Sequence, residues 1–376
     1  MNINDGLINL GVQEQTEQRD VLPLSNWGWT PAKQAEFDAL NLTECVPGRV
    51  VTEHKAMYNV VTEAGELLVQ VSGKFRHESM SRSDYPAVGD WVAVQPLAGD
   101  GRGIVHAILK RSSKFSRKIA GTTTEEQIVA ANVDTILLVN ALNHDFNLRR
   151  IERYLILAWE SGANPVIVLT KADLQDNPLV KVHEVEAIAP GVSVLVTSTL
   201  SGDGLDAVRE LARPGETLAL IGSSGAGKSS LVNALFEREV QAVQDVRAGD
   251  DRGRHTTTHR ELFLLPSGGV VVDTPGMREL QLWHADEGFG EAFEDIEVLA
   301  RSCRFSDCSH QGERDCAIAA ALASGELDSA RYGSYLKLQK ELAYLARKDA
   351  GTQRQKDKEF GRKISKYFKE VQRSKR

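Results

Sequence analysis

One stretch of the chain combines the residue types and the spacing that bind phosphate. It runs from Gly222 to Ser229 and fits the P-loop pattern G-x-x-x-x-G-K-[ST]. An apolar run over residues 217–221 precedes it and a helical pattern over 230–235 follows, which is the strand–loop–helix setting that the pattern requires. Backbone N–H groups at such a helix start point at the anion, and we expect Lys228 to reach the β- and γ-phosphates. The predicted phosphate-binding residues are Gly222, Ser223, Ser224, Gly225, Ala226, Gly227, Lys228, Ser229 and Ser230.

A second phosphate-linked motif, D-x-x-G, spans Asp273 to Gly276 and follows an apolar run. In nucleotide hydrolases the aspartate approaches Mg²⁺ through water, and the glycine amide senses the γ-phosphate. Ser229 is predicted to ligate the same Mg²⁺, together with a switch threonine from the segment between the two motifs. Thr258 is the first choice and Thr257 the second; the alternative is a mobile basic loop, which does not exclude switching.

The residue after this motif is Met277, where Ras-like enzymes carry the glutamine that orients the attacking water. We therefore expect slow intrinsic turnover. His255 is a candidate to position the water instead, although a histidine in such a loop is more often a surface residue. The predicted catalytic residues are Lys228, His255 and Thr258.

A third motif, T-K-x-D, directly follows the apolar run 165–169 and resembles the guanine-reading N-K-x-D element of GTPases. One carboxylate can accept from both N1–H and the 2-amino group of guanine, a pair that adenine lacks. Threonine in place of asparagine removes an amide that commonly braces the P-loop, which predicts lower affinity. Ser198, after the next apolar run, lies in the element that matches the backbone contact to guanine O6. The predicted guanine-site residues are Thr170, Lys171, Ala172, Asp173 and Ser198.

The order of these motifs is informative. In common GTPases the guanine-reading elements follow the P-loop and D-x-x-G, whereas here they precede both. Because chain termini often lie close together, a chain can be cut and rejoined elsewhere without changing a compact site. The sequence thus predicts a circularly permuted GTPase domain, in which the γ-phosphate sensor leads directly into the C-terminal segment.

That segment holds a compact set of metal-ligand residues: Cys303, Cys308, His310 and Cys316. Three thiolates and one imidazole form a closed tetrahedral set for one structural Zn²⁺ ion. The fourth cysteine, Cys45, is distant, so an odd cluster in a chain expected to be cytosolic favours metal over disulfides.

Composition is that of a globular protein of two or three domains, with 376 residues and 41% hydrophobic content. Apolar runs such as 136–139 are too short to span a bilayer, and no secretory start is visible, so we expect a cytoplasmic protein. Residues 352–376 carry a net charge of +7, which leaves −14 on the remainder. A basic tail on an acidic body suggests a polyanionic partner, and a solvated helix end is the alternative.

The elements that must position these motifs follow from hydrophobic patterning. Five short β runs between residues 45 and 113 suit an OB-like barrel, for which RNA binding and a purely structural role stay open. Strands then alternate with helices, and the chain turns helical beyond residue 283. The barrel residues that could contact RNA are Lys74, Arg76, His77, Arg82, Lys110, Arg111 and Lys114. The predicted domains are an extension (1–44), the OB-like barrel (45–115), the permuted α/β P-loop GTPase (116–282), a zinc-binding helical domain (283–350) and a basic tail (351–376).

The combination of barrel, permuted GTPase with G-R-H-T-T-T and D-T-P-G, and C-x4-C-x-H-x5-C cluster resembles the ribosome small-subunit-dependent GTPase A (RsgA) family. The resemblance implies binding of GTP or GDP, Mg²⁺ and Zn²⁺, and slow GTP hydrolysis stimulated by the small ribosomal subunit during its late maturation. It implies the subunit and its rRNA as partners, with no membrane, no DNA and a monomeric state. The alternatives are a P-loop ATPase or kinase, and a nucleotide-gated RNA-binding protein with incidental hydrolysis.

Overall fold

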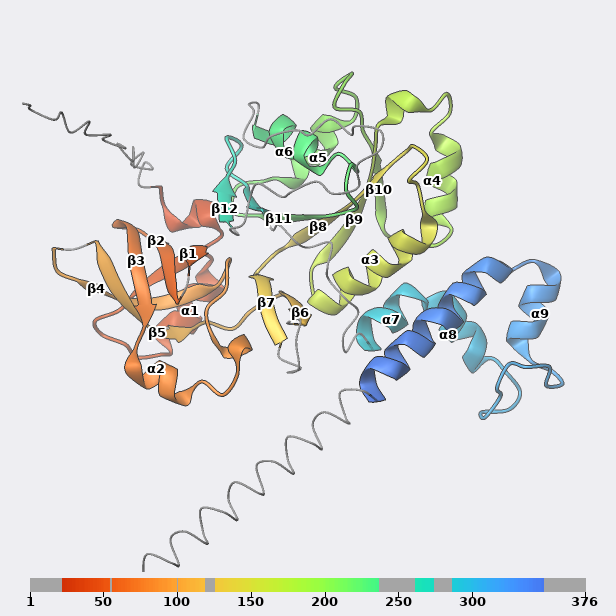
Figure 1. The fold of residues 1–376 in the computed structure, drawn as a ribbon, viewed down its shortest axis with the longest axis horizontal. Coiled ribbons are helices and arrows are strands. Elements are labelled where there is room, and N and C mark those ends of the chain that lie inside the picture. The colour runs from red at the N-terminus through yellow and green to blue at the C-terminus, as the bar shows by residue number, and fades with distance from the viewer. Residues whose placement is uncertain are drawn as a thin grey trace, which may run out of the picture.

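The computed structural model describes residues 22–54, 56–99, 101–118, 126–236, 261–273 and 286–347. A barrel, an α/β domain and a helical domain follow one another along this part of the chain (Figure 1). Several predicted features lie outside the described residues: His255, Thr257, Thr258, Gly276, Met277 and the basic tail over 351–376.

The first domain is a closed five-stranded barrel. Its strands are paired in the order β1-β2-β3-β5-β4, and a β1–β4 pairing closes the ring. Only β3 and β5 run parallel. Valine side chains and Tyr58 fill the interior, as the alternating pattern of inward and outward residues requires. The predicted OB-like barrel is confirmed. The strands are β1 (Val46–His54), β2 (Met57–Thr62), β3 (Gly65–Val71), β4 (Trp91–Leu97) and β5 (Arg102–Ile108).

The segment before the barrel forms η1 (Leu24–Trp27) and α1 (Pro31–Asp38), and it packs onto the barrel. Leu24 and Trp27 are buried, and the rings of Trp29 and Trp91 lie 4.8 Å apart. From residue 22 onward, the predicted extension is therefore ordered and packs against the outside of the barrel. Shorter elements that patterning did not predict are α2 (Gly73–Glu78), η2 (Arg82–Asp84) and the hairpin of β6 (Lys114–Lys118) and β7 (Glu126–Ala131).

The second domain is a parallel sheet with one antiparallel edge strand, in the order β10-β9-β8-β11-β13-β12. The strands that precede the P-loop strand β11 in sequence lie beside it in space, as a permuted domain requires. The helices α3 and α4 contribute to the hydrophobic cluster on one face, and α5 and α6 contribute to the cluster on the other (Figure 1). The strands are β8 (Thr135–Ala141), β9 (Asn164–Thr170), β10 (Ser193–Val196), β11 (Thr217–Ile221), β12 (Glu261–Leu264) and β13 (Val270–Asp273). The helices are α3 (Leu148–Ser161), η3 (Ala172–Leu174), α4 (Leu179–Glu186), α5 (Leu205–Leu211) and α6 (Lys228–Phe236).

The barrel and the α/β domain are joined by a strand pairing and a buried arginine. Thr52 of β1 pairs with Glu261 of β12, so that one sheet runs through both domains. Arg49 is 1% exposed and donates to the Trp27, Gly89 and Asn132 carbonyls and to the Thr217 hydroxyl. Burial lowers the pKa of Arg49 to about 10, so the guanidinium stays protonated at neutral pH.

Replacement of Arg49 by methionine is expected to lower the free energy of unfolding by about 3 kcal/mol, because several buried acceptors lose their donor. Urea denaturation measures the change. The matched control is Arg102→Met on the exposed end of β5, which we expect to shift stability by less than about 0.5 kcal/mol. Equal effects of the two substitutions would contradict the role given to Arg49.

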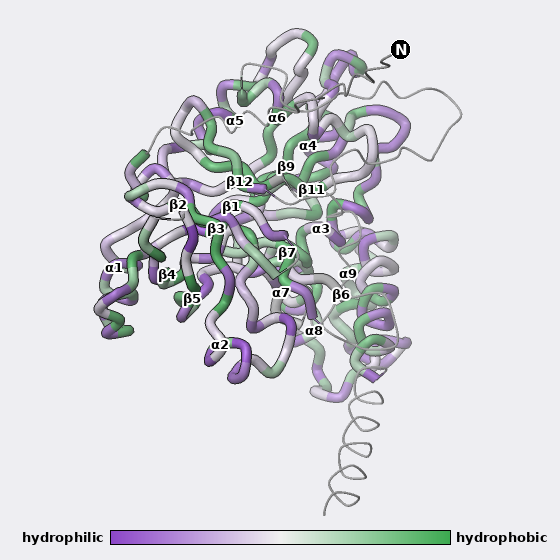
Figure 2. The backbone as a smooth tube through the Cα atoms, turned by 60° about the vertical axis from the view of Figure 1, so that its left-hand side comes forward, coloured by the Kyte–Doolittle hydropathy of each residue, from purple (hydrophilic) through white to green (hydrophobic). Residues whose placement is uncertain are grey.

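The third domain is helical and packs on α3. It contains α7 (Asp286–Ala292), α8 (Glu294–Arg301), α9 (Ala317–Ser324) and a further helix over 329–347. Aromatic rings of Phe289, Phe293 and Tyr335 lie 5.1 to 5.5 Å from one another at its centre. Figure 2 shows apolar residues along the central strands and polar residues along α2. Among the described residues, no helix has both the length and the apolar character needed to cross a membrane.

Candidate nucleotide and metal sites

The P-loop leaves β11 and turns into α6 in a tight curve. A Cβ at Gly222 would lie 2.3 Å from the Val139 carbonyl oxygen, so only glycine lets the loop pass β8 this closely. Gly227 has φ +92° and begins the turn into the helix. Lys228 Nζ donates to the carbonyls of Gly222 and Ser223, at 2.7 Å each. The lysine therefore folds back over the loop, on the side where a phosphate is expected.

Thr170 connects the T-K-x-D element to the P-loop. Its hydroxyl is buried and donates to the Ala226 carbonyl at 2.6 Å. A Cβ at Gly227 would lie 3.3 Å from the same hydroxyl oxygen, so the two loops are in direct contact. The sequence predicted that threonine removes a P-loop brace; the structure shows instead that the threonine hydroxyl supplies one.

We expect Thr170→Val to weaken GDP binding about tenfold, because the Ala226 carbonyl loses its donor without a change in side-chain size. A titration with fluorescent GDP measures the affinity. Thr170→Ser keeps the hydroxyl and should bind nearly as tightly as the unmodified chain. If the valine variant binds GDP as tightly as the serine variant, the brace has no role in affinity.

Asp173 is held in place by the neighbouring loop. The Ser198 hydroxyl donates to Asp173 Oδ1 at 2.5 Å, and the Ala172 amide donates to the Thr197 carbonyl at 3.1 Å. Lys171 adopts the left-handed conformation, with φ 58°, where the chain turns from β9 into η3. These contacts fix the position of the Asp173 carboxylate beside the loop that carries Ser198.

Ser198 lies in the element Thr197-Ser198-Thr199, whose predicted backbone contact to guanine O6 stays a prediction. The Ser198 amide donates to the Asp203 carbonyl at 2.9 Å. Its side chain orients Asp173, a role that no sequence pattern indicated. The adjacent Thr197 hydroxyl is buried and has no hydrogen-bond partner among the described residues, as expected beside the place of a polar ligand.

Asp273 ends β13, which runs parallel to β11 with Ala219 opposite Val272. This register brings the first residue of D-x-x-G to the same sheet edge as the P-loop. The P-loop, the T-K-x-D element, the loop with Ser198 and Asp273 thus lie at the same edge of the sheet. Their order along the chain is permuted.

The cysteine and histidine cluster has the dimensions of a zinc site. The four ligand atoms lie within 4.8 Å of one another. Cys303 Sγ and Cys316 Sγ are 3.9 Å apart, and each lies 3.5 Å from His310 Nδ1. Tetrahedral zinc with ordinary bond lengths requires S···S near ~3.8 Å and S···N near ~3.6 Å. Cys303, Cys308, His310 and Cys316 therefore fit one structural Zn²⁺ ion.

The start of α9 supports this cluster. Cys316 is the N-cap residue, and its sulfur accepts from the Ala319 amide at 3.4 Å. The Ala317 amide donates to the Cys303 sulfur at 3.3 Å. These two amides hold the Cys303 and Cys316 sulfurs at the start of α9.

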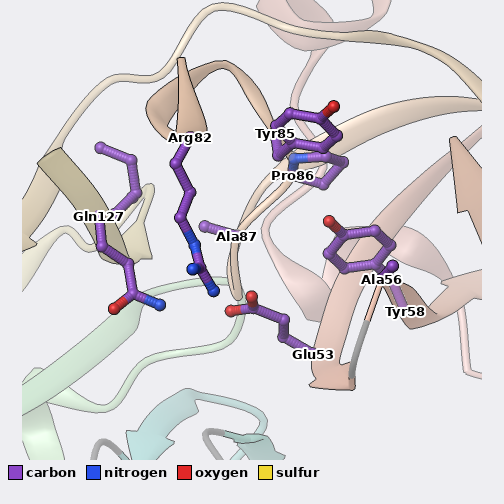
Figure 3. Close-up of a pocket in the computed structure, with 9 residues that line it drawn as sticks. Glu53, Ala56, Tyr58, Arg82, Tyr85, Pro86, Ala87 and Gln127 are labelled. Atoms are coloured by element: carbon purple, nitrogen blue, oxygen red, sulfur yellow. The ribbon is translucent and has the colours of Figure 1, made fainter. Parts of the chain in front are cut away.

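The basic residues of the barrel divide into two groups. Arg111 forms a bidentate ion pair with the buried Asp90, at 2.8 and 2.6 Å, and Lys114 pairs with Glu126. Arg111 also donates to the Ser83 and Tyr85 carbonyls, so this predicted RNA contact is a structural residue. The other predicted cations are exposed, and Lys74 among them pairs with Glu78 at 3.9 Å; they are Lys74, Arg76, His77, Arg82 and Lys110. Arg82 also lines a hollow of about 200 Å³ at the junction with β7, where Glu53, Tyr58 and Gln127 face it (Figure 3).

Comparison with known proteins decides the family. A family model described as RsgA GTPase matches residues 108–283. The Small ribosomal subunit biogenesis GTPase RsgA of Opitutus terrae is 44% identical over 336 residues, which cover 87% of this chain and 92% of that protein. The chain belongs to the RsgA family. Membership confirms the resemblance predicted from the motifs, together with GTP and Mg²⁺ as the implied ligands.

Solved structures agree with this family. YjeQ from Thermotoga maritima has a TM-score of 0.60 and 31% identity, covering 80% of this chain and 99% of that one. YloQ, described as a circularly permuted GTPase, has a TM-score of 0.59 and 25% identity, covering 80% and 96%. The RsgA-family fold thus includes the permuted order seen here.

Proposed function

We propose that the chain is a GTP hydrolase that binds the small ribosomal subunit and acts in its biogenesis. The observation that carries this proposal is the contact of the T-K-x-D element with the P-loop through Thr170 and Ala226. It brings a guanine-selective carboxylate and a phosphate loop into one site. The relatives' names, which specify small-subunit biogenesis, support the choice of partner.

In this proposal Asp173 selects guanine, and Lys228 with the P-loop amides stabilises the charge that develops on the γ-phosphate. Bound Mg²⁺ supplies charge neutralisation at the phosphates. Ser229 and Thr258 would hold that ion, with Asp273 near it, and the Gly276 amide would sense the γ-phosphate. His255 orients the attacking water in a chain that carries Met277 after D-x-x-G, which keeps intrinsic turnover slow.

Contact with rRNA is the finer part of the proposal. The exposed cations around α2 and the basic tail offer charge for a phosphate backbone, and such binding weakens steeply with salt. The protein acts as a cytoplasmic monomer without DNA or membrane partners.

Co-sedimentation with purified small subunits tests the proposal. We expect more protein in the subunit pellet with a non-hydrolysable GTP analogue than with GDP, and no such difference between ATP and ADP analogues. Equal pelleting with every nucleotide would refute a guanine-controlled partner. Large subunits serve as the matched control.

A further inference from the structure

The loop that leads into α3 is rigidly joined to that helix. Asn147 caps the helix, and its side chain accepts from the Arg149 amide at 2.9 Å. Two residues earlier, the Asp145 amide donates to Asn143 Oδ1 at 3.0 Å. The loop is therefore joined to the first turn of α3 at two places, through the Asn147 cap and through the ion pair of Asp145 with Arg150.

Asp145 lies in the loop between β8 and α3 and contacts the P-loop through its carboxylate. Its carboxylate accepts from the Ser223 hydroxyl at 2.6 Å and from Arg150 at 2.6 and 3.0 Å. The pairing with Arg150 lowers the pKa of Asp145, so the bond to Ser223 is charge-assisted. The Ser223 carbonyl in turn accepts from Lys228. One P-loop residue is thus held at its side chain by Asp145 and at its backbone by the phosphate-binding lysine.

The next part of α3 anchors the C-terminal domain. Glu152 is 1% exposed and accepts from Arg331 at 3.2 Å and from Ser334 at 2.5 Å, both on the helix over 329–347. Arg331 also forms a bidentate pair with Asp295, at 2.7 Å for both bonds. A Cβ at Gly288 of α7 would lie 2.3 Å from the Ile156 carbonyl, so α7 and α3 touch backbone to backbone.

We propose that Asp145 is a positioning residue for nucleotide binding, and that α3 links it to the C-terminal domain, so that docking of this domain sets the geometry of the P-loop. Arg150, the ion-pair partner of Asp145, and Glu152 are two residues apart on α3, or about 3 Å along the helix axis, a span over which a helix behaves as a stiff rod. The inference rests on the proposed function in taking a guanine nucleotide as the ligand. This connection through α3 between the C-terminal domain and the P-loop is separate from the direct connection along the chain after D-x-x-G.

The test is the release rate of fluorescent N-methylanthraniloyl-GDP from the full chain with Mg²⁺, measured by stopped flow. We expect about tenfold faster release for Asp145→Asn and about threefold for Glu152→Gln, with melting temperatures recorded in parallel. Because both changes act through α3, the double variant should release about tenfold faster, not thirtyfold. Asp145→Glu keeps the charge and should restore part of the loss. Ser334→Ala replaces Glu152→Gln if the latter does not fold.

Arg153→Gln is the matched control, because it removes a half-exposed bidentate pair with Glu341 between the same two elements. We expect it to change release less than twofold. Unchanged release in Asp145→Asn would overturn the positioning role, and strictly multiplicative effects in the double variant would overturn the link through α3. Tighter binding of ADP than GDP by the unmodified chain would instead refute the proposed function, and the same variants would then be measured with fluorescent ADP.

Discussion

Asp173→Asn is expected to lower GTP affinity about 100-fold and to create affinity for xanthosine triphosphate. The substitution removes the carboxylate that we propose accepts two guanine hydrogens. A hydrogen bond that involves a charged group contributes up to about 3 kcal/mol. Since Ser198 donates to Oδ1, the new amide is oriented with its NH₂ group toward the base. That group can donate to the 2-oxo group of xanthine, which replaces the amino group of guanine. Competition binding with GTP, ATP and xanthosine triphosphate measures the switch.

The Ser198 hydroxyl provides the control for this prediction. Ser198→Ala leaves Asp173 charged but removes its orienting bond, so we expect a modest loss of GTP affinity, about fivefold, and no gain for xanthosine triphosphate. If Asp173→Asn retains full preference for GTP, the T-K-x-D element does not read the base.

Cys308→Ser is expected to remove the bound zinc, from one equivalent to nearly none, and to unfold the loop between α8 and α9. Structural zinc sites contribute about 10 kcal/mol or more of binding free energy, which is also folding free energy. Metal analysis of the purified protein and proteolysis of the C-terminal domain measure the two effects. Cys45→Ser, which changes the cysteine distant from the cluster, should keep both the zinc and the protease resistance. Full zinc content in Cys308→Ser would contradict the ligand assignment.

The elements of the fold were largely predictable because each has its own periodic signal. The strands that became β8, β9 and β11 are continuous apolar runs, as buried parallel strands require. The strand β12, between β13 and β1, has only four residues and carried no such signal. The packing of Trp29, between η1 and α1, on Trp91 was also not predicted, because it depends on a tertiary contact between residues far apart in the chain.

The site was predictable at the level of motifs, whereas the connections between motifs were not. The P-loop, T-K-x-D and the zinc cluster each have fixed spacing, which a sequence displays directly. The roles of Thr170 and Ser198 depend on side chains that meet across neighbouring loops. Arg111 was mistaken for an RNA contact because its partner, Asp90, lies 21 residues away. The location of Asp145 at the end of β8, beside β11, was the one available signal for its contact with the P-loop.

The most direct test of a guanine-nucleotide switch that responds to the small ribosomal subunit is the GTP hydrolysis rate of the full chain with and without purified small subunits. We predict slow hydrolysis alone and at least a tenfold increase with small subunits, abolished by Lys228→Ala and absent with large subunits. A rate that is unchanged by small subunits, or an equal stimulation of ATP hydrolysis, would contradict this function.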